Sequence, residues 1–273
     1  MEEKALTAKK SGFSMLPLCF IVFASGAALF VYAIGHLERG ENALGGFLLV
    51  VAILGYIAGI IALPGFKVLK PQEALVLTLF GHYAGTLREP GFYWVCPFCT
   101  AVNPAAGTKL SQSGDVDGGA HAASQSDGMG KKISLKMMTL NNSRQKINDC
   151  LGNPVEIGIA VIWRVTDTAK AVFNVDNYKE YLSLQCDSAL RNVVRVYPYD
   201  VAPNVDTTGD GVADEGSLRG SSEVVAARIR DEIQKNVAEA GIEVVEARIT
   251  YLAYAPEIAA VMLQRQQASA IID

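Results

Sequence analysis

Histidine is scarce in this sequence, and recognised catalytic motifs are missing from it. It holds three histidines, His36, His82 and His121, which stand far apart in the chain. It contains no G-x-S-x-G nucleophile turn, no HExxH zinc motif and no complete nucleotide-binding glycine loop. Carboxylates such as Glu232 and Glu239 fall on predicted solvated helix faces, where ion pairing between successive helical turns accounts for them. We therefore predict that the protein is not an enzyme and has no catalytic residue, cofactor or metal site.

An excess of either charge is also missing. Lys and Arg number 24 against 28 Asp and Glu, which gives a formal net charge of -4. Because the two signs are interspersed along the chain, no basic face is predicted. A nucleic-acid partner is therefore excluded.

Charge of both signs is nearly absent from the first 63 residues, apart from the N-terminal tail and one short loop. Residues 15–37 and 43–63 contain no Asp, Glu, Lys or Arg. Each run exceeds the roughly 20 residues that a helix needs to cross a hydrocarbon core about 30 Å thick. The first run is too long for a signal peptide, and a second follows at once. We predict a tail over residues 1–14 and two transmembrane helices over 15–37 and 43–63, with a re-entrant hairpin as the alternative.

The short connector between the two apolar runs predicts that both ends of the pair emerge on the same side of the membrane. Basic residues flank the outer ends of the pair: Lys4, Lys9, Lys10, Lys67 and Lys70. Only Arg39 lies between the runs. The positive-inside rule then places the N-terminus and the following domain in the cytoplasm of a multi-pass cell-membrane protein. Thiols stay reduced in that compartment, which suits the later cysteines Cys96, Cys99, Cys150 and Cys186.

Beyond residue 64 the chain alternates short strand patterns with helix patterns. Apolar residues recur with period two from Val155 to Val165, which predicts a strand that pairs with the preceding segment across a tight turn. Amphipathic helices are predicted from Asp176 to Tyr197 and from Ser221 to Gly241, and a strand over 242–254. The predicted class is α+β, with helices packed on an antiparallel sheet.

Two segments lack any apolar periodicity. Residues 100–130 are rich in Gly, Ser, Ala and Asp and are predicted to form a flexible insertion, because they cannot bury enough apolar surface to offset their ordering entropy. Residues 201–217 form an acidic loop with calcium-loop spacing at several positions. Thr208 and Ser217, however, stand where a calcium loop needs carboxylates. A solvated loop is therefore the favoured interpretation, and a calcium site is the alternative.

Cys96-Pro-Phe-Cys99 has the spacing of a metal or redox pair. A structural zinc site needs four ligands, and only His82, His121 and Cys150 are available to complete it. A redox pair favours a cysteine at a helix N-terminus, whereas Cys96 follows a strand pattern. The surrounding apolar residues predict instead a membrane-surface contact made by Phe92, Tyr93, Trp94 and Phe98, since aromatic rings prefer the interfacial depth. Packing in the core of the domain is the alternative for these residues.

Pro256 opens a last amphipathic pattern that predicts a C-terminal helix over residues 256–273. A helix of about 18 residues is marginal alone in water, so we expect it to pack on a neighbouring copy or to continue beyond Asp273. Subunit contacts are predicted from this helix and from the helix that begins after Ser221. The residues assigned to oligomerisation are Val225, Ile229, Ile233, Val237, Ile258, Val261, Met262, Ala268 and Ile272.

Three segments carry a family resemblance that covers most of residues 65–273. They read "KPQEALVLTLFGHYAGTLREPGFYWVCPF", "NDCLGNPVEIGIAVIWRVTDTAKAVFNVDNYKEYLSLQCDSALRNVVRVYPYD" and "SLRGSSEVVAARIRDEIQKNVAEAGIEVVEARITYLAYAPEIAAVMLQRQQASAI". On these segments the chain resembles the Band 7 or SPFH family, which includes stomatin, prohibitin and flotillin, and is most similar to bacterial stomatin-like membrane proteins. The resemblance implies a Band 7 domain over residues 64–255.

The resemblance also implies a function. It implies a membrane-anchored scaffold that forms large homo-oligomers and organises membrane microdomains and neighbouring membrane proteins. The expected partners are further copies of the chain, membrane lipids and a membrane protease or other membrane protein. Two alternatives stay open: an adaptor that regulates one membrane protease or channel, and a membrane-tethered thiol or metal protein that acts through Cys96 and Cys99.

Overall fold

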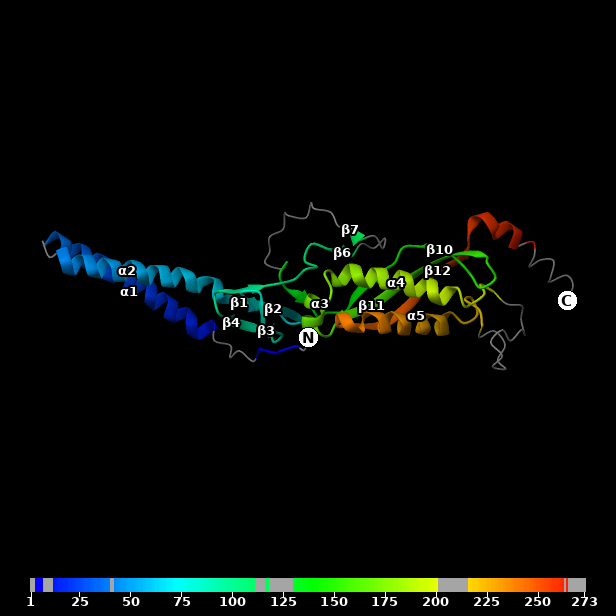
Figure 1. Ribbon diagram of the computed structural model, residues 1–273, viewed down its shortest axis with the longest axis horizontal. Coiled ribbons are helices and arrows are strands. Elements are labelled where there is room, and N and C mark those ends of the chain that lie inside the picture. Colours follow the sequence, from blue (N-terminus) through cyan, green and yellow to red (C-terminus); the bar gives the residue numbers. More distant parts are fainter. Residues whose placement is uncertain are drawn as a thin grey trace. The chain divides into compact units, whose positions relative to one another are not determined.

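The computed structural model divides the chain into two compact units (Figure 1). The first, here called the anchor unit, holds residues 3–103 and 131–134. The second, here called the large unit, holds residues 104–130 and 135–273. The residues that the structure describes are 3–6, 12–39, 42–110, 116–117, 130–200, 216–262 and 264. Helices and antiparallel sheets occur together, so the predicted α+β class is confirmed.

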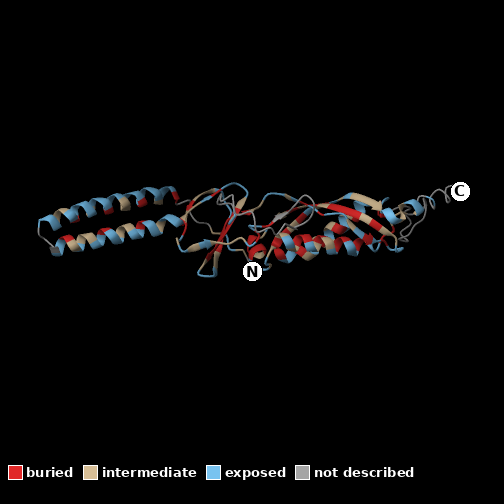
Figure 2. Ribbon diagram, turned by 90° about the horizontal axis from the view of Figure 1, so that it is seen from above, coloured by how far each residue is buried: buried red, intermediate tan, exposed pale blue. Residues whose placement is uncertain are grey.

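The anchor unit begins with a hairpin of two long helices, α1 (Gly12–Glu38) and α2 (Asn42–Ala62). Both are long and apolar enough to cross a membrane. Small residues let the helices approach closely, since a Cβ at position 59 would lie 2.9 Å from the ring of Phe23. Most of the remaining surface of both helices is exposed (Figure 2). This exposed surface is apolar and therefore suited to lipid.

The rest of the anchor unit is two small antiparallel sheets. In one, β1 pairs with β4; in the other, β2 pairs with β3, β5 and β8. The strands are β1 (Phe66–Leu69), β2 (Glu73–Leu79), β3 (His82–Leu87), β4 (Gly91–Trp94), β5 (Cys99–Ala101) and β8 (Ile133–Ser134). The 3-10 turn η1 (Leu63–Gly65) joins α2 to β1. Leu69, Leu75, Leu77, Leu87, Tyr93 and Val95 form their shared core.

The N-terminal tail joins one of these sheets. Ala5 forms a parallel bridge with Thr86 of β3. The tail precedes α1 in the chain, whereas β3 follows α2. The two ends of the helical hairpin therefore meet in one sheet.

The large unit is built on β11 (Pro154–Val165), which pairs antiparallel with β12 (Ile242–Tyr254) and, on its other side, with two shorter strands. The shorter strands are β9 (Met138–Asn141) and β10 (Gln145–Asn148). The predicted period-two face of β11 is confirmed, since Val155, Ile157, Ile159, Val161, Trp163 and Val165 are all buried. Two further two-residue strands, β6 (Lys109–Leu110) and β7 (Val116–Asp117), pair with each other.

Helices cover the buried face of this sheet. They are α3 (Thr168–Phe173), α4 (Tyr178–Val194) and α5 (Ser222–Val237). Tyr178 of α4 packs edge-on against Trp163, with ring centroids 6.3 Å apart. After α5 a 3-10 turn, η2 (Ala238–Ala240), leads to Gly241 at a φ of 65°. A Cβ at Gly241 would meet the backbone oxygen of Asp167, so this close turn requires glycine.

The predicted flexible insertion is wrong for its first residues. Thr100 pairs with Thr78 in the ladder between β5 and β2. Farther on, the ammonium of Lys179 donates hydrogen bonds to the carbonyl oxygens of Ala105, at 3.1 Å, and Thr108, at 2.6 Å. These contacts are made by small residues and backbone atoms. They produce no hydrophobic periodicity, so the sequence gives no sign of them. Residues 111–115 and 118–129 of the predicted insertion lie outside the described residues, as do residues 201–215 of the predicted acidic loop.

Candidate membrane-surface site

The strand order of the anchor unit places one end of its sheets beside the ends of the two helices. β1 follows α2 after the short η1 turn, and its first residue, Phe66, pairs with Trp94 at the last position of β4. The Trp94 indole N–H donates a hydrogen bond of 3.2 Å to the carbonyl oxygen of Ala62, where α2 ends. β4 therefore runs toward the end of α2 and is fixed to it by this hydrogen bond.

An aromatic cluster surrounds this junction. Phe92 stacks on Phe66 with ring centroids 5.4 Å apart and meets Phe13 of α1 edge-on at 5.3 Å. Gly12, the first residue of α1, contacts the Phe92 ring and leaves no room for a side chain. Aromatic rings are favoured at the ends of membrane-spanning helices, so this cluster is a candidate for the membrane surface. Phe92 thus joins the start of α1 to the strand that follows α2.

A second aromatic pair lies at the same end of the sheet and is open to solvent. β2 runs toward this end, where Leu79 pairs with Cys99, so the β2–β3 turn lies next to the segment that leads into β5. The rings of Phe80 and Phe98 stack there with centroids 6.1 Å apart. Their exposed fractions are 80% and 56%.

Phe80 was missed by the sequence-based assignment. It occupies the two-residue turn between β2 and β3 with a φ of 48°, followed by Gly81 at 85°. Such turns favour Asn, Asp or Gly, because both central residues have positive φ. A large apolar residue at this position therefore indicates a surface role. The strand patterns on either side of Gly81 predict the turn, and they could have identified Phe80 from the sequence.

The predicted membrane-contact residues separate into two groups. Phe92, Trp94 and Phe98 lie at the helix junction or near the exposed turn, as described above. Tyr93 is only 2% exposed and packs in the core of the anchor unit, where its hydroxyl donates to the Glu89 carbonyl oxygen at 3.0 Å. The assignment of Tyr93 to the membrane surface is wrong, because neighbouring strand residues point to opposite faces of a sheet.

The Cys96 and Cys99 pair lies beside the exposed turn. Cys96 is exposed and Cys99 is half-buried. Burial, with a further contribution from Cys96, raises the pKa of the Cys99 thiol, which disfavours the thiolate that redox or metal chemistry uses. Among the described residues no group of three or more His, Cys, Asp or Glu could hold a metal ion. Cys150 belongs to the large unit, and His121 lies outside the described residues.

The apolar stripe of α5 does not form a subunit contact. Val225, Ile229, Ile233 and Val237 each have an exposed fraction of 0% within the single chain. The helix packs against β12 and α4 of its own unit. The oligomerisation assignment is therefore wrong for these four residues, because the amphipathic pattern marks the face that the helix buries in its own fold.

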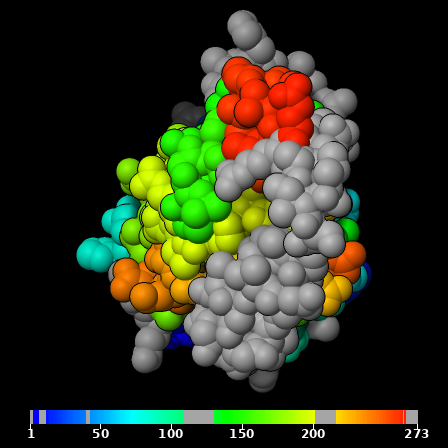
Figure 3. Space-filling model, turned by 90° about the vertical axis from the view of Figure 1, so that its right-hand side faces the viewer, coloured from blue at the N-terminus to red at the C-terminus, as the bar shows by residue number. Residues whose placement is uncertain are grey.

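The C-terminal helix keeps an open surface over the part that is described. Residues 256–262 are helical and lie beside β10 (Figure 3), to which they are joined by an ion pair of 2.5 Å between Glu257 and Lys146. Val261 is exposed, and Ile258 and Met262 are half-buried. The other two predicted contact residues, Ala268 and Ile272, lie outside the described residues.

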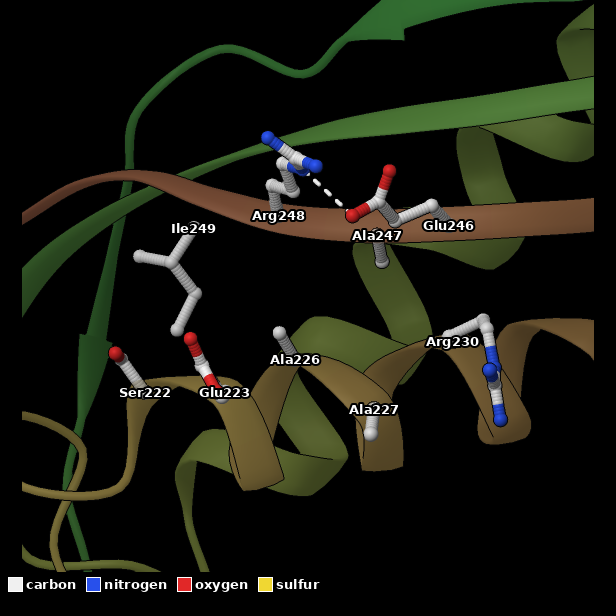
Figure 4. Close-up of a pocket in the computed structure, with 9 residues that line it drawn as sticks. All are labelled: Ser222, Glu223, Ala226, Ala227, Arg230, Glu246, Ala247, Arg248 and Ile249. Atoms are coloured by element: carbon white, nitrogen blue, oxygen red, sulfur yellow. Dashed lines mark hydrogen bonds and ion pairs between the residues drawn. The ribbon is translucent and has the colours of Figure 1, made fainter.

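A groove of about 520 Å³ runs between α5 and β12 (Figure 4). Both arginines that line it are engaged by carboxylates, since Arg248 donates to Glu246 at 2.6 Å and Arg230 donates to Asp231 at 2.9 Å. Glu223 adds a further carboxylate to the lining, so the groove is poorly suited to a phosphate. Its floor is made of small apolar residues, Ala226, Ala227 and Ala247 among them.

Comparison with known families identifies the fold. The model of the SPFH domain / Band 7 family matches residues 67–273. The chain belongs to this family. Comparison with curated proteins gives no match.

We predict that Ile229→Ala lowers the free energy of unfolding by about 2–5 kcal/mol, because it leaves a cavity in the core of the large unit. Val224→Ala, on the exposed side of the same helix, is the matched control and is expected to change it by less than about 0.5 kcal/mol. Thermal unfolding in detergent, followed by circular dichroism, measures both. If Ile229→Ala left the free energy of unfolding unchanged but lowered the mass of the oligomer, the α5 stripe would be a subunit contact after all.

A second prediction concerns the depth of Trp94. The chain has two tryptophans, so Trp163→Phe leaves Trp94 as the sole emitter and Trp94→Phe leaves Trp163. In vesicles made with lipids brominated near the headgroup, we expect strong fluorescence quenching of Trp94 and little quenching of Trp163, which is fully buried in protein. Equal quenching in the two variants would show that the β4 terminus does not lie at the membrane surface.

Proposed function

We propose that this chain is a membrane-anchored scaffold that assembles into a large homo-oligomer and organises neighbouring lipids and membrane proteins. Membership of the Band 7 family supports the assembly. The observation that carries the anchoring is the packing of a helical hairpin and a β-structure into one unit, joined by the Trp94–Ala62 hydrogen bond and the Phe92 cluster. The segments that resemble stomatin support a place among the stomatin-like members.

The proposed location is the cell membrane, with both ends of the hairpin in the cytoplasm. Pairing of Ala5 with Thr86 supports a common side, because the tail and β3 lie on opposite sides of the hairpin in sequence. Lys67 and Lys70, which follow α2, support the cytoplasmic side. A lone Arg39 in the connector gives the other side little positive charge.

The proposed membrane contact is the turn that carries Phe80 and Phe98, together with the aromatic cluster at the helix ends. Exposed stacked rings are costly in water and favourable among lipid headgroups. The turn and the helix ends lie at one end of the anchor unit. The contact would therefore hold the sheet close to the inner leaflet.

The proposed assembly surface is the C-terminal helix, residues 256–273, because α5 uses its apolar stripe internally. Ile258, Val261 and Met262 supply the described part of this surface, and Ala268 and Ile272 continue the pattern. Each contact is small. Confinement of all copies to the membrane plane raises their effective concentration, so weak lateral contacts accumulate into a stable assembly.

We predict that the detergent-solubilised protein has a mass many times the 29.2 kDa of one chain. Light scattering coupled to gel filtration, corrected for bound detergent, measures it. Val261→Asp is expected to reduce the mass, because it places a charge on the proposed contact. Val224→Asp, a second exposed valine, should leave it unchanged. A monomer or dimer in mild detergent would contradict the scaffold.

A further inference from the structure

The edge of β3 binds an extended peptide segment, which is the N-terminal tail of the chain. β3 lies at the end of the sheet order β3-β2-β5, so one of its edges is paired with none of the strands that the structure describes. On this edge the Leu6 N–H donates to the Thr86 carbonyl oxygen, and the Thr86 N–H donates to the Lys4 carbonyl oxygen, each at 2.9 Å. This is the hydrogen-bond pattern of a peptide that adds a strand to a sheet edge.

Side chains match the tail to this edge at both ends. Arg88 pairs with the carboxylate of Glu3 at 3.1 Å. Leu6 packs on the core of the anchor unit. Glycine at position 85 makes room for it, because the backbone there has a φ of 148° and a Cβ would lie 2.5 Å from the Leu6 Cγ. The edge thus contacts the side chains of Glu3 and Leu6, and it binds the two residues between them through backbone atoms.

Every contact in this set is between residues 3–6 and the strands and turns of the anchor unit that follow α2. No contact in the set involves the helical hairpin that connects the two partners. The same contacts therefore form whether the tail belongs to the same chain or to another copy. An identical element that docks in the same way within or between copies is the basis of strand exchange.

We propose that the tail is exchangeable, so that residues 3–6 of one copy occupy the β3 edge of the next copy in the membrane. This rests on the proposed homo-oligomer. Residues 7–11 connect Leu6 to α1, and an extended linker of that length spans roughly 20 Å. Such a reach suits copies that lie side by side, and their confinement to the membrane plane favours the exchange.

The exchange gives the assembly a direction. Where each copy accepts a tail from one neighbour and donates its own to the neighbour on the other side, the contact is head-to-tail rather than two-fold symmetric. Contacts of this type close into rings when the rotation between copies allows it. The tail supplies a link that is independent of the C-terminal helix.

The test uses Ala5→Cys and Thr86→Cys in a full-length chain whose exposed or half-exposed cysteines, Cys96, Cys99 and Cys150, are replaced by serine. Bridge partners in a sheet lie about 5 Å apart, within reach of a disulfide. The two single-cysteine chains are co-expressed, oxidised in membrane vesicles and run on non-reducing gels. We expect a band at twice the mass of the chain, which reductant removes.

Two controls make the result specific. Ala5→Cys co-expressed with Val68→Cys, an exposed residue of β1 outside the register, is expected to give at least severalfold less of the band. Leu6→Asp added to the Ala5→Cys chain should abolish the band, because it removes the apolar contact that seats the tail.

The outcomes separate this proposal from the scaffold itself. A chain that carries both cysteines and forms only an internal disulfide, while the co-expressed single variants form none, shows that the tail stays in its own chain. If the protein is still many times the mass of one chain, exchange is overturned and the scaffold stands. If the protein is also monomeric, both are overturned.

Discussion

The apolar surface of α1 and α2 is the constraint on which the rest of the structure depends. Exposed large hydrophobic side chains line both helices, from Phe13 to Ile61. Keeping this surface out of water is favourable by about 25 cal/mol per Å², and helices satisfy their own backbone polar groups in lipid. The hairpin is therefore suited to lipid, and the sheets that follow are organised around the point where the helices end.

In the anchor unit, several contacts join the ends of the two helices to the sheets that follow. Trp94 bonds to the last turn of α2, Phe92 packs on the start of α1, and the tail joins β3. Segments from before and after the hairpin thus build one β-structure. A unit closed in this way brings the two ends of the hairpin together, which is the arrangement that the proposed scaffold on one membrane face needs.

Much of this fold could be predicted from the sequence, because the patterns concerned are local. The period-two run ending at Val165 and the turn at Gly241 each appear in the structure as predicted. What the sequence left ambiguous is which partner an apolar face meets. The apolar stripe of α5, which includes Ile229, and the strand residue Tyr93 have the sequence pattern expected of an interface. Both are buried within the chain. The tail was not predicted to pair, since four residues of mixed character carry no strand pattern.

The most direct test of the account is alkaline carbonate extraction of membranes that contain the full chain. Two lipid-immersed helices predict that the protein stays in the membrane pellet and is released only by detergent. Recovery of the chain in the carbonate supernatant as a monomer of 29.2 kDa would contradict the account, because the hairpin would then be part of a water-soluble protein.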